Sequence, residues 1–193
     1  LTREIIKDYA EQYYQHVKAF PRYISATHSI CDDIEKRKIL LENLQDEENT
    51  EADHPKLWKK FAEAVGSDIK KIEDVKPDWF TKDMIENFFS QARSSYAEGL
   101  ASLYTYERQI PEIAETKIQG LKKFYGVNSK DGLHFFEAHK SADVIHRAEC
   151  EKLLDSLSKD EQEKAEKASL LTARYLWNFL SGMVKKHNLQ LAA

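Results

Sequence analysis

The sequence contains few of the residues that turn or cross-link a chain. Among its 193 residues there are only 6 glycines, 4 prolines and 2 cysteines. Scarce glycine and proline leave few sites for tight turns, which disfavours folds built from many short strands. The two cysteines, Cys31 and Cys150, cannot form a disulfide framework. These absences favour a helical protein without cross-links.

Long apolar runs and an excess of one charge are also missing. No run of 18 or more apolar residues and no signal peptide is recognisable. The 33 acidic and 29 basic residues are mixed along the chain and give a net charge of -4, so no basic face is expected. We therefore expect a protein of the reducing cytoplasm that binds neither nucleic acid nor membranes.

Apolar residues that recur at intervals of three and four are abundant, as is typical of amphipathic helices. With 41% hydrophobic and 32% charged residues, the composition predicts an all-α protein. We expect a single helical domain over residues 1–193, lacking an upstream N-terminal helix. About seven helices should form a compact bundle. They span residues 2–29 with a kink or an interruption at Pro21, 32–48, 55–66, 81–107, 111–126, 129–157 and 158–183.

Residues that cap helices mark the predicted starts. Thr2, Thr81 and Ser129 each precede an apolar repeat, as N-caps do. Asp32 and Ser158 are each followed three residues later by glutamate, which is the spacing of a capping box. Residues 67–80 have no sustained period, so we expect a connection with one short helical turn.

One helical face carries two imidazoles with a carboxylate between them. His139, Asp143 and His146 stand at i, i+4 and i+7, which places them within roughly 60° of one another on a helix. Such a face can chelate a metal, although one helix cannot complete the site. For this helix alone, histidines packed at a helix crossing, with Asp143 paired to Arg147, are an equally good interpretation.

Three further residues can supply ligands from elsewhere. Glu107 lies on an apolar face, where a carboxylate is costly to bury unless it is paired or metal-bound. The alternative interpretation is that Glu107 forms an ion pair with Arg108, Lys117 or Arg147. Glu47 and His54 are seven residues apart and share a face if the second helix continues to Pro55. Otherwise His54 caps a helix and Glu47 belongs to a solvated acidic run.

The six candidate ligands together argue for a metal centre more strongly than any one of them does. They combine three carboxylates with three imidazoles, a formal charge of about -3 that two divalent ions would neutralise. Mixed oxygen and nitrogen donors suit iron or manganese, whereas structural zinc sites rely on cysteine. We therefore expect two metal ions about 3.5–4 Å apart. The candidate ligands are Glu47, His54, Glu107, His139, Asp143 and His146.

Four segments that contain these residues resemble a known family over nearly the whole chain. They resemble the family of the chlamydial protein associating with death domains, within the heme-oxygenase-like, TenA/PqqC-like helical superfamily. The spacings ExxxxxxH, Tyr-Glu before Ile-Pro, and HxxxDxxH occur in the family's order. The segments are YAEQYYQHVKAFPRYISATHS, DEENTEADHPKLW, LYTYERQIPEIAETKIQGL and HKSADVIHRAE.

This resemblance implies a dinuclear, O2-activating enzyme with iron–iron or manganese–iron at the six positions, and with O2 and a reductant as co-substrates. It also implies synthesis of para-aminobenzoate for folate, in which a tyrosine of the protein supplies the ring and a lysine the amino nitrogen. Lys117 falls on the lysine position and Tyr106 on a tyrosine beside the metal site. The consumed tyrosine is implied to lie upstream of Leu1. Without the resemblance, Lys117 would be interpreted as a solvated lysine and Tyr106 as a core residue.

Other functions stay open at this point. A TenA-like thiamin-pyrimidine hydrolase would use a cysteine nucleophile, and Cys150 lies four residues after His146. If the ligands do not converge, a cofactorless oxidase like PqqC is the alternative. A metal-free interaction module would expose apolar surface on the first and last helices, but a homodimer interface explains the same pattern. We expect a homodimer, and a further protein partner only by analogy with the family.

Overall fold

The protein is all-helical in the part of the chain that the structure describes. This computed structural model describes the backbone of residues 1–48 and 53–190, and the side chains there except those of residues 141–146. The described chain contains no strand. Its elements are α1 (Arg3–Val17), α2 (Phe20–Ser29), α3 (Ile34–Glu47), α4 (His54–Ala64), a 3-10 turn η1 (Ile72–Asp74), α5 (Trp79–Ser94), α6 (Tyr96–Glu107), α7 (Ile110–Tyr125), α8 (Lys130–Asp155) and α9 (Lys159–Lys186).

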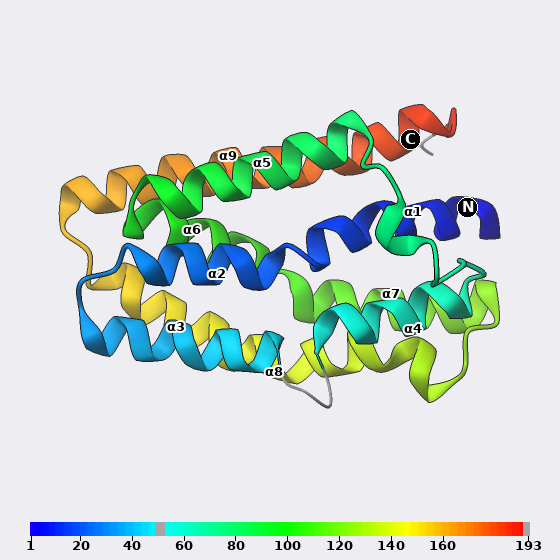
Figure 1. Ribbon diagram of the computed structural model, residues 1–193, viewed down its shortest axis with the longest axis horizontal. Coiled ribbons are helices and arrows are strands. Elements are labelled where there is room, and N and C mark those ends of the chain that lie inside the picture. Colours follow the sequence, from blue (N-terminus) through cyan, green and yellow to red (C-terminus); the bar gives the residue numbers. More distant parts are fainter. Residues whose placement is uncertain (49–52, 191–193) are drawn as a thin grey trace.

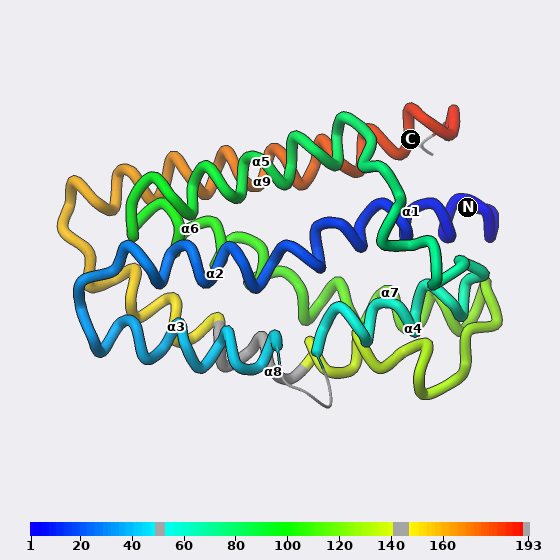
Figure 2. The backbone as a smooth tube through the Cα atoms, viewed as in Figure 1, coloured from blue at the N-terminus to red at the C-terminus, as the bar shows by residue number. Residues whose placement is uncertain are grey.

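The helices form an elongated bundle in which α8 and α9 are the longest elements (Figure 1). Helix α9 packs on α5 and α6, whereas α8 packs on α4 and α7. In the backbone trace, α3 and α4 follow one another along α8 (Figure 2). Helices α3 and α4 therefore both lie beside α8.

Breaks in the helices explain why nine α-helices are seen in the described residues where about seven were predicted. The prediction of one continuous helix over residues 81–107 is wrong. Ser95 adopts an extended conformation, with φ -153° and ψ 163°, and separates α5 from α6. The Ser95 hydroxyl accepts a hydrogen bond from the Glu98 amide, which starts α6. A second break follows Val17, so that Pro21 lies in the first turn of α2.

Two predicted caps are also wrong. Thr81 is a buried residue inside α5, and its hydroxyl donates a hydrogen bond to Gln12 of α1 over 2.8 Å. The cap of α3 is Asp33 rather than Asp32, since the Asp33 carboxylate accepts from the amides of the first turn. The remaining predicted caps are confirmed: Thr2, Ser129 and the capping box of Ser158. The expected short turn between residues 67 and 80 is η1.

The core is rich in aromatic rings, many of which pack edge to face. Trp58 is fully buried, and its indole N–H donates to the Ala10 carbonyl over 2.8 Å, so that α4 is held against α1. Its ring meets Phe135 of α8 at 4.7 Å between centroids. These contacts fix the first half of α8 against α4, next to the candidate ligands. Among the described helices, none is both long enough and apolar enough to cross a membrane.

Candidate metal centre

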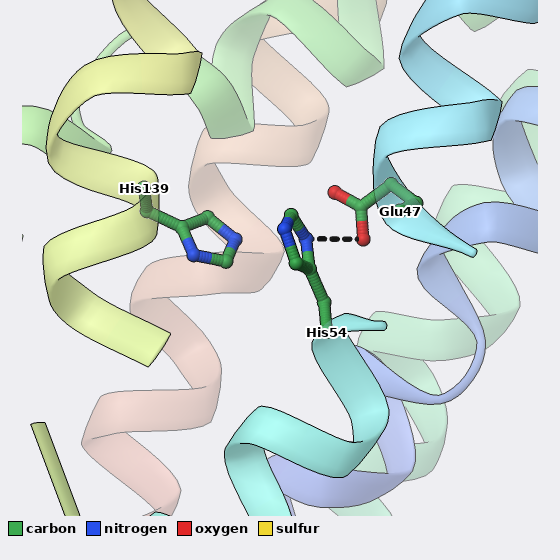
Figure 3. Close-up of side chains that lie close together, drawn as sticks. All are labelled: Glu47, His54 and His139. Carbon is green, nitrogen blue, oxygen red and sulfur yellow. Dashed lines mark ion pairs between the residues drawn. The ribbon is translucent and has the colours of Figure 1, made fainter. Parts of the chain in front are cut away.

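Three of the candidate ligands converge in the middle of the bundle. Glu47, His54 and His139 each offer a ligand atom, and these atoms lie within 4.8 Å of one another. All three side chains are buried, with at most 6% of their surface exposed. Figure 3 shows the two imidazoles facing each other, with the Glu47 carboxylate on the other side of the His54 ring.

Local helix chemistry places two of these residues at facing helix ends. Glu47 is the last residue of α3, and His54 is the first residue of α4. The start of α4 is fixed by Asp53, whose carboxylate accepts from the Lys56 amide over 2.7 Å, and by Pro55 in the first turn. Glu47 and His54 therefore do not share one helical face, but meet from two successive helices beside α8.

His54 and Glu47 form a close buried pair of an imidazole and a carboxylate. The Nδ1 atom of His54 lies 2.7 Å from Oε2 of Glu47, yet it has no aligned hydrogen-bond partner. Burial lowers the pKa of His54, but the neighbouring carboxylate of Glu47 outweighs burial, and the pKa is raised overall. A metal ion bound to this ring would replace the proton that the neighbouring carboxylate favours.

His139 is oriented by its own helix. Its Nδ1 atom lies 2.7 Å from the carbonyl oxygen of Phe135, and since a carbonyl only accepts, Nδ1 carries the proton. The lone pair of the ring is then on Nε2. Hydrogen bonding of the second ring nitrogen to a backbone carbonyl is a common way in which a metal-binding imidazole is held. The ring also packs 4.1 Å from the His54 ring, measured between centroids.

Glu107, at the end of α6, is the fourth candidate ligand and is 2% exposed. Its carboxylate accepts a hydrogen bond from the Asn43 amide over 2.7 Å and contacts the Cys150 thiol at 3.7 Å. No described lysine or arginine side chain forms an ion pair with it. Burial, assisted by the charge of Glu47 and opposed by the Asn43 hydrogen bond, raises the pKa of Glu107 to about 8. The charged form of Glu107 would therefore be stabilised by a nearby cation.

The last two candidate ligands, Asp143 and His146, belong to α8, one and two turns beyond His139. Their side chains lie outside the described residues, so their ligand role stays a prediction. The same holds for an ion pair between Asp143 and Arg147. Arg147 does lie near the carboxylates of Glu112 and Glu151, at 3.8 Å each.

The donor chemistry fits a metal ion. One buried carboxylate and two buried imidazoles converge there, from Glu47, His54 and His139. Glu107 is not in this cluster, but it is buried close enough for the charge of Glu47 to raise its pKa. Such oxygen and nitrogen donors suit iron or manganese. Cys150 contacts Glu107, and burial followed by the charge of Glu107 raises the pKa of its thiol. A thiol in that state is a poor nucleophile, which disfavours the hydrolase alternative.

Lys117 and Tyr106 lie beside the same centre. The Lys117 ammonium donates to the Tyr9 hydroxyl over 2.5 Å and lies 4.9 Å from the centre of the Tyr9 ring. A small cavity of about 10 Å³, the space of roughly one water molecule, is lined by Lys117, Tyr106 and His139. Lys117 is thus half-buried rather than solvated, and it faces the ligand region across this cavity.

Sequence reasoning missed two residues that contact the predicted ones. Tyr9 fits the apolar period of the first helix, and nothing in that period indicates its bond to Lys117. Asn43 belongs to no recognised motif, although it holds Glu107. Asn43 lies one helical turn before Glu47 on α3, and this i, i+4 spacing is the signal that could have found it.

Helices arranged in this way define a known class, the heme oxygenase-like fold. A TenA homologue from Pseudomonas syringae superposes with a TM-score of 0.78 at 16% identity, over 96% of this chain and 81% of that one. A domain of unknown function with a heme oxygenase-like fold, from Shewanella denitrificans, gives a TM-score of 0.73 at 17% identity, over 100% and 86%. These likenesses confirm the predicted fold.

Within this class the family can be stated. Residues 7–177 match the family described as "Iron-containing redox enzyme", and the chain belongs to that family. The 4-aminobenzoate synthase of Chlamydia muridarum is 41% identical over 186 residues, which are 96% of this chain and 79% of that protein. The resemblance inferred from the four sequence segments is therefore confirmed.

Proposed function

We propose that the protein is an O2-activating oxidoreductase with two metal ions, and that it makes 4-aminobenzoate from side chains of its own chain. The convergence of Glu47, His54 and His139, with Glu107 buried nearby, carries this proposal. The family of iron-containing redox enzymes and the 4-aminobenzoate synthase of Chlamydia muridarum support it.

The proposed ligands come from the end of α3, the start of α4, the end of α6 and the middle of α8. Bound iron, alone or with manganese, would supply the activation of O2, for which a reductant is the second co-substrate. The chain holds these ligands in a dry interior, since every described member of the set is at most 6% exposed. The proposed ligands are Glu47, His54, Glu107, His139, Asp143 and His146.

Lys117 is proposed to supply the amino nitrogen. Its ammonium lies in a cage of three rings, 4.9 Å from Tyr9, 5.5 Å from Tyr13 and 5.6 Å from Phe136. The small cavity that is lined by Lys117, Tyr13 and Phe136 is also lined by His139. Tyr106 is the proposed tyrosine beside the metal ions.

Replacement of Lys117 tests this role. Lys117→Arg keeps the positive charge but removes the amino group that is proposed to be transferred. We therefore expect no 4-aminobenzoate when the iron-loaded variant is supplied with O2 and a reductant. Metal content should stay at the wild-type level. Lys122→Arg, on an exposed position of the same helix, is the matched control and should keep full production.

The product is best measured by mass spectrometry after growth with ¹⁵N-lysine, which labels the nitrogen of the lysine side chains. We expect the label in 4-aminobenzoate made by the wild type and by Lys122→Arg. Unlabelled 4-aminobenzoate, or undiminished production by Lys117→Arg, would show that Lys117 has been misassigned.

A further inference from the structure

His16 of α1 is fully buried, yet neither nitrogen of its ring has a hydrogen-bond partner among the described residues. Buried side-chain nitrogens are nearly always paired, so this exception calls for an explanation. Burial lowers the pKa of His16 to about 3, and the imidazole is therefore neutral at physiological pH. The interior thus contains a neutral base whose ring nitrogens are not used by the fold.

Tyr23 of α2 is a second buried group of this kind and packs against His16. Its side chain is 0% exposed, and its hydroxyl has no described hydrogen-bond partner. The rings of Tyr23 and His16 lie 5.7 Å apart, measured between centroids. The other described rings packed on Tyr23 are those of Phe20, Phe88 and Phe89, which carry no base. Among these rings, His16 is therefore the one that can take up the proton of Tyr23.

A line of aromatic rings connects this pair to the metal centre and to the surface. On the inner side, the His16 ring lies 5.1 Å from that of Tyr106, the residue before the proposed ligand Glu107. On the outer side, the Tyr23 ring lies 4.7 Å from that of Phe89, a half-buried residue of α5. Rings in direct contact are suited to moving single electrons through a dry interior.

The chemistry of a buried phenol explains why a base is needed beside it. Burial raises the pKa of Tyr23 well above its ordinary value, so its hydroxyl is protonated. A phenol that has lost an electron is a strong acid and must pass on its proton. In an interior without water, a neighbouring neutral imidazole is the group that can accept it. Two buried polar groups without partners thus become complementary when Tyr23 is oxidised.

We propose that Tyr23 and His16 form a redox-active pair, in which Tyr23 gives up one electron and passes its hydroxyl proton to His16. The oxidant is the metal centre after it has taken up O2, so this inference rests on the proposed function. It gains the electron by way of Tyr106, and a tyrosyl radical and an imidazolium are left. One electron from the reductant, together with the proton on His16, restores Tyr23. The pair is an outlet for oxidising equivalents that does not consume Lys117.

A photo-oxidant attached to the surface tests the pair in the full chain without any metal. Arg93 is exposed and its guanidinium lies 4.6 Å from the centre of the Phe89 ring, so a ruthenium complex on Arg93→Cys sits at the outer end of the line. Cys31 and Cys150 are buried and should not be labelled. After a laser flash with an external quencher, the ruthenium(III) complex takes up one electron. We expect the transient absorption of a tyrosyl radical.

Substitutions in the labelled protein assign this signal. Tyr23→Phe should abolish it, and should not lower the free energy of unfolding, because only a hydroxyl without a described partner is removed. His16→Leu removes the proton acceptor and should slow radical formation about tenfold or more. Tyr104→Phe is the control and should keep the full signal, since the Tyr104 hydroxyl lies at the surface and donates to Glu151.

The iron-loaded protein shows whether the pair is used with O2. After mixing with O2 and rapid freezing, electron paramagnetic resonance should detect a tyrosyl radical that sharpens when the tyrosine rings are deuterated. Tyr23→Phe should lose this signal and still make 4-aminobenzoate.

The pair is overturned if the flash produces no tyrosyl radical, if Tyr23→Phe gives the same signal, or if His16→Leu forms the radical at the wild-type rate. A protein that makes 4-aminobenzoate with O2 but forms no radical at Tyr23 would overturn the outlet alone. A flash-induced radical at Tyr23 in a protein that makes no 4-aminobenzoate would support the pair and count against the proposed function.

Discussion

Asn43 donates a hydrogen bond to Glu107, which is the more deeply buried of the two candidate carboxylates that the structure describes. Its amide donates to Oε1 of Glu107 over 2.7 Å, and the second oxygen of Glu107 contacts Cys150. Glu47 lies one helical turn further along the same helix as Asn43. One short stretch of α3 thus supplies a proposed ligand and orients another.

Replacement of Asn43 should therefore weaken the metal centre without removing a ligand. For Asn43→Leu, which has a similar shape, we expect metal affinity to fall about 10–100-fold, as for other residues that orient ligands. Competition with a chelator during anaerobic Fe(II) titration measures this change. Glu42→Gln, exposed on the same helix, should bind as the wild type does. Unchanged affinity in Asn43→Leu would show that its bond to Glu107 has no part in metal binding.

Helices α5 and α9 pack closely at one glycine. A Cβ atom added to Gly182 of α9 would lie 2.3 Å from the Phe80 ring of α5, and Phe80 is buried. Gly120 of α7 provides the opposite case, because nothing lies within 4 Å of an added Cβ there. The two glycines occupy helix interiors with very different surroundings.

We expect Gly182→Ala to lower the free energy of unfolding by ~1–3 kcal/mol, the usual cost of overpacking a core. Gly120→Ala should instead raise it by ~0.5–1 kcal/mol, because alanine favours the helix. Urea unfolding followed by circular dichroism measures both. If Gly182→Ala is as stable as the wild type, α9 and α5 are not packed as closely as described.

Glu73 joins three elements, because η1 carries it against α1 and α4. Its carboxylate accepts from Tyr14 and Lys59 over 2.5 Å each, and from Lys18 over 3.0 Å. Burial raises the pKa of Glu73, but these hydrogen bonds outweigh it and lower the pKa to about 2. The folded state therefore favours the charged form of this side chain.

The sign of the pH dependence follows from this lowered pKa. An unfolded glutamate titrates near ~4.3, so the stabilisation by Glu73 is complete above that pH and is lost as the pH falls toward about 2. Since the side chain is 45% exposed, we expect a contribution of at most ~1 kcal/mol. Glu73→Gln should lose it, and Glu63→Gln, on an exposed position of α4, should not. Equal acid unfolding of Glu73→Gln and the wild type would contradict this assignment.

At the scale of the whole molecule, α9 presents an apolar stripe to solvent. Leu170, Trp177 and Leu180 are 65%, 68% and 49% exposed, and their spacing places them near one face. We propose that this stripe is covered by a second copy of the chain, as a homodimer. Sedimentation velocity should give a dimer for the wild type and a monomer for Trp177→Glu, whereas a monomeric wild type would contradict the proposal.

Much of the fold was predictable because the start of a helix is determined by residues close to it in the sequence. Thr2, Ser129 and Ser158 cap helices where predicted, since each needs only its own next turn. The break at Ser95 was missed, because the apolar period runs through it and its extended backbone is a single-residue feature. The prediction of Thr81 as a cap is wrong, because its partner Gln12 lies 69 residues away.

In the candidate site, too, features set by one helix were predictable, whereas contacts between distant segments were not. The spacing of His139, Asp143 and His146 follows from one helix, but the meeting of Glu47 and His54 depends on how α3 and α4 align along α8. Sequence periodicity carries no information about that alignment, and the segments were linked only by their combined donor types and by the family resemblance. The contact between Lys117 and Tyr9 spans 108 residues and was likewise beyond local reasoning.

The metal content of the purified protein tests the central claim most directly. Elemental analysis of protein from cells supplied with iron and manganese should find about two metal ions per chain, as expected for a dinuclear centre. His139→Ala should contain clearly less metal while keeping its helical content. A wild type without metal, or a His139→Ala protein with the full content, would contradict the account.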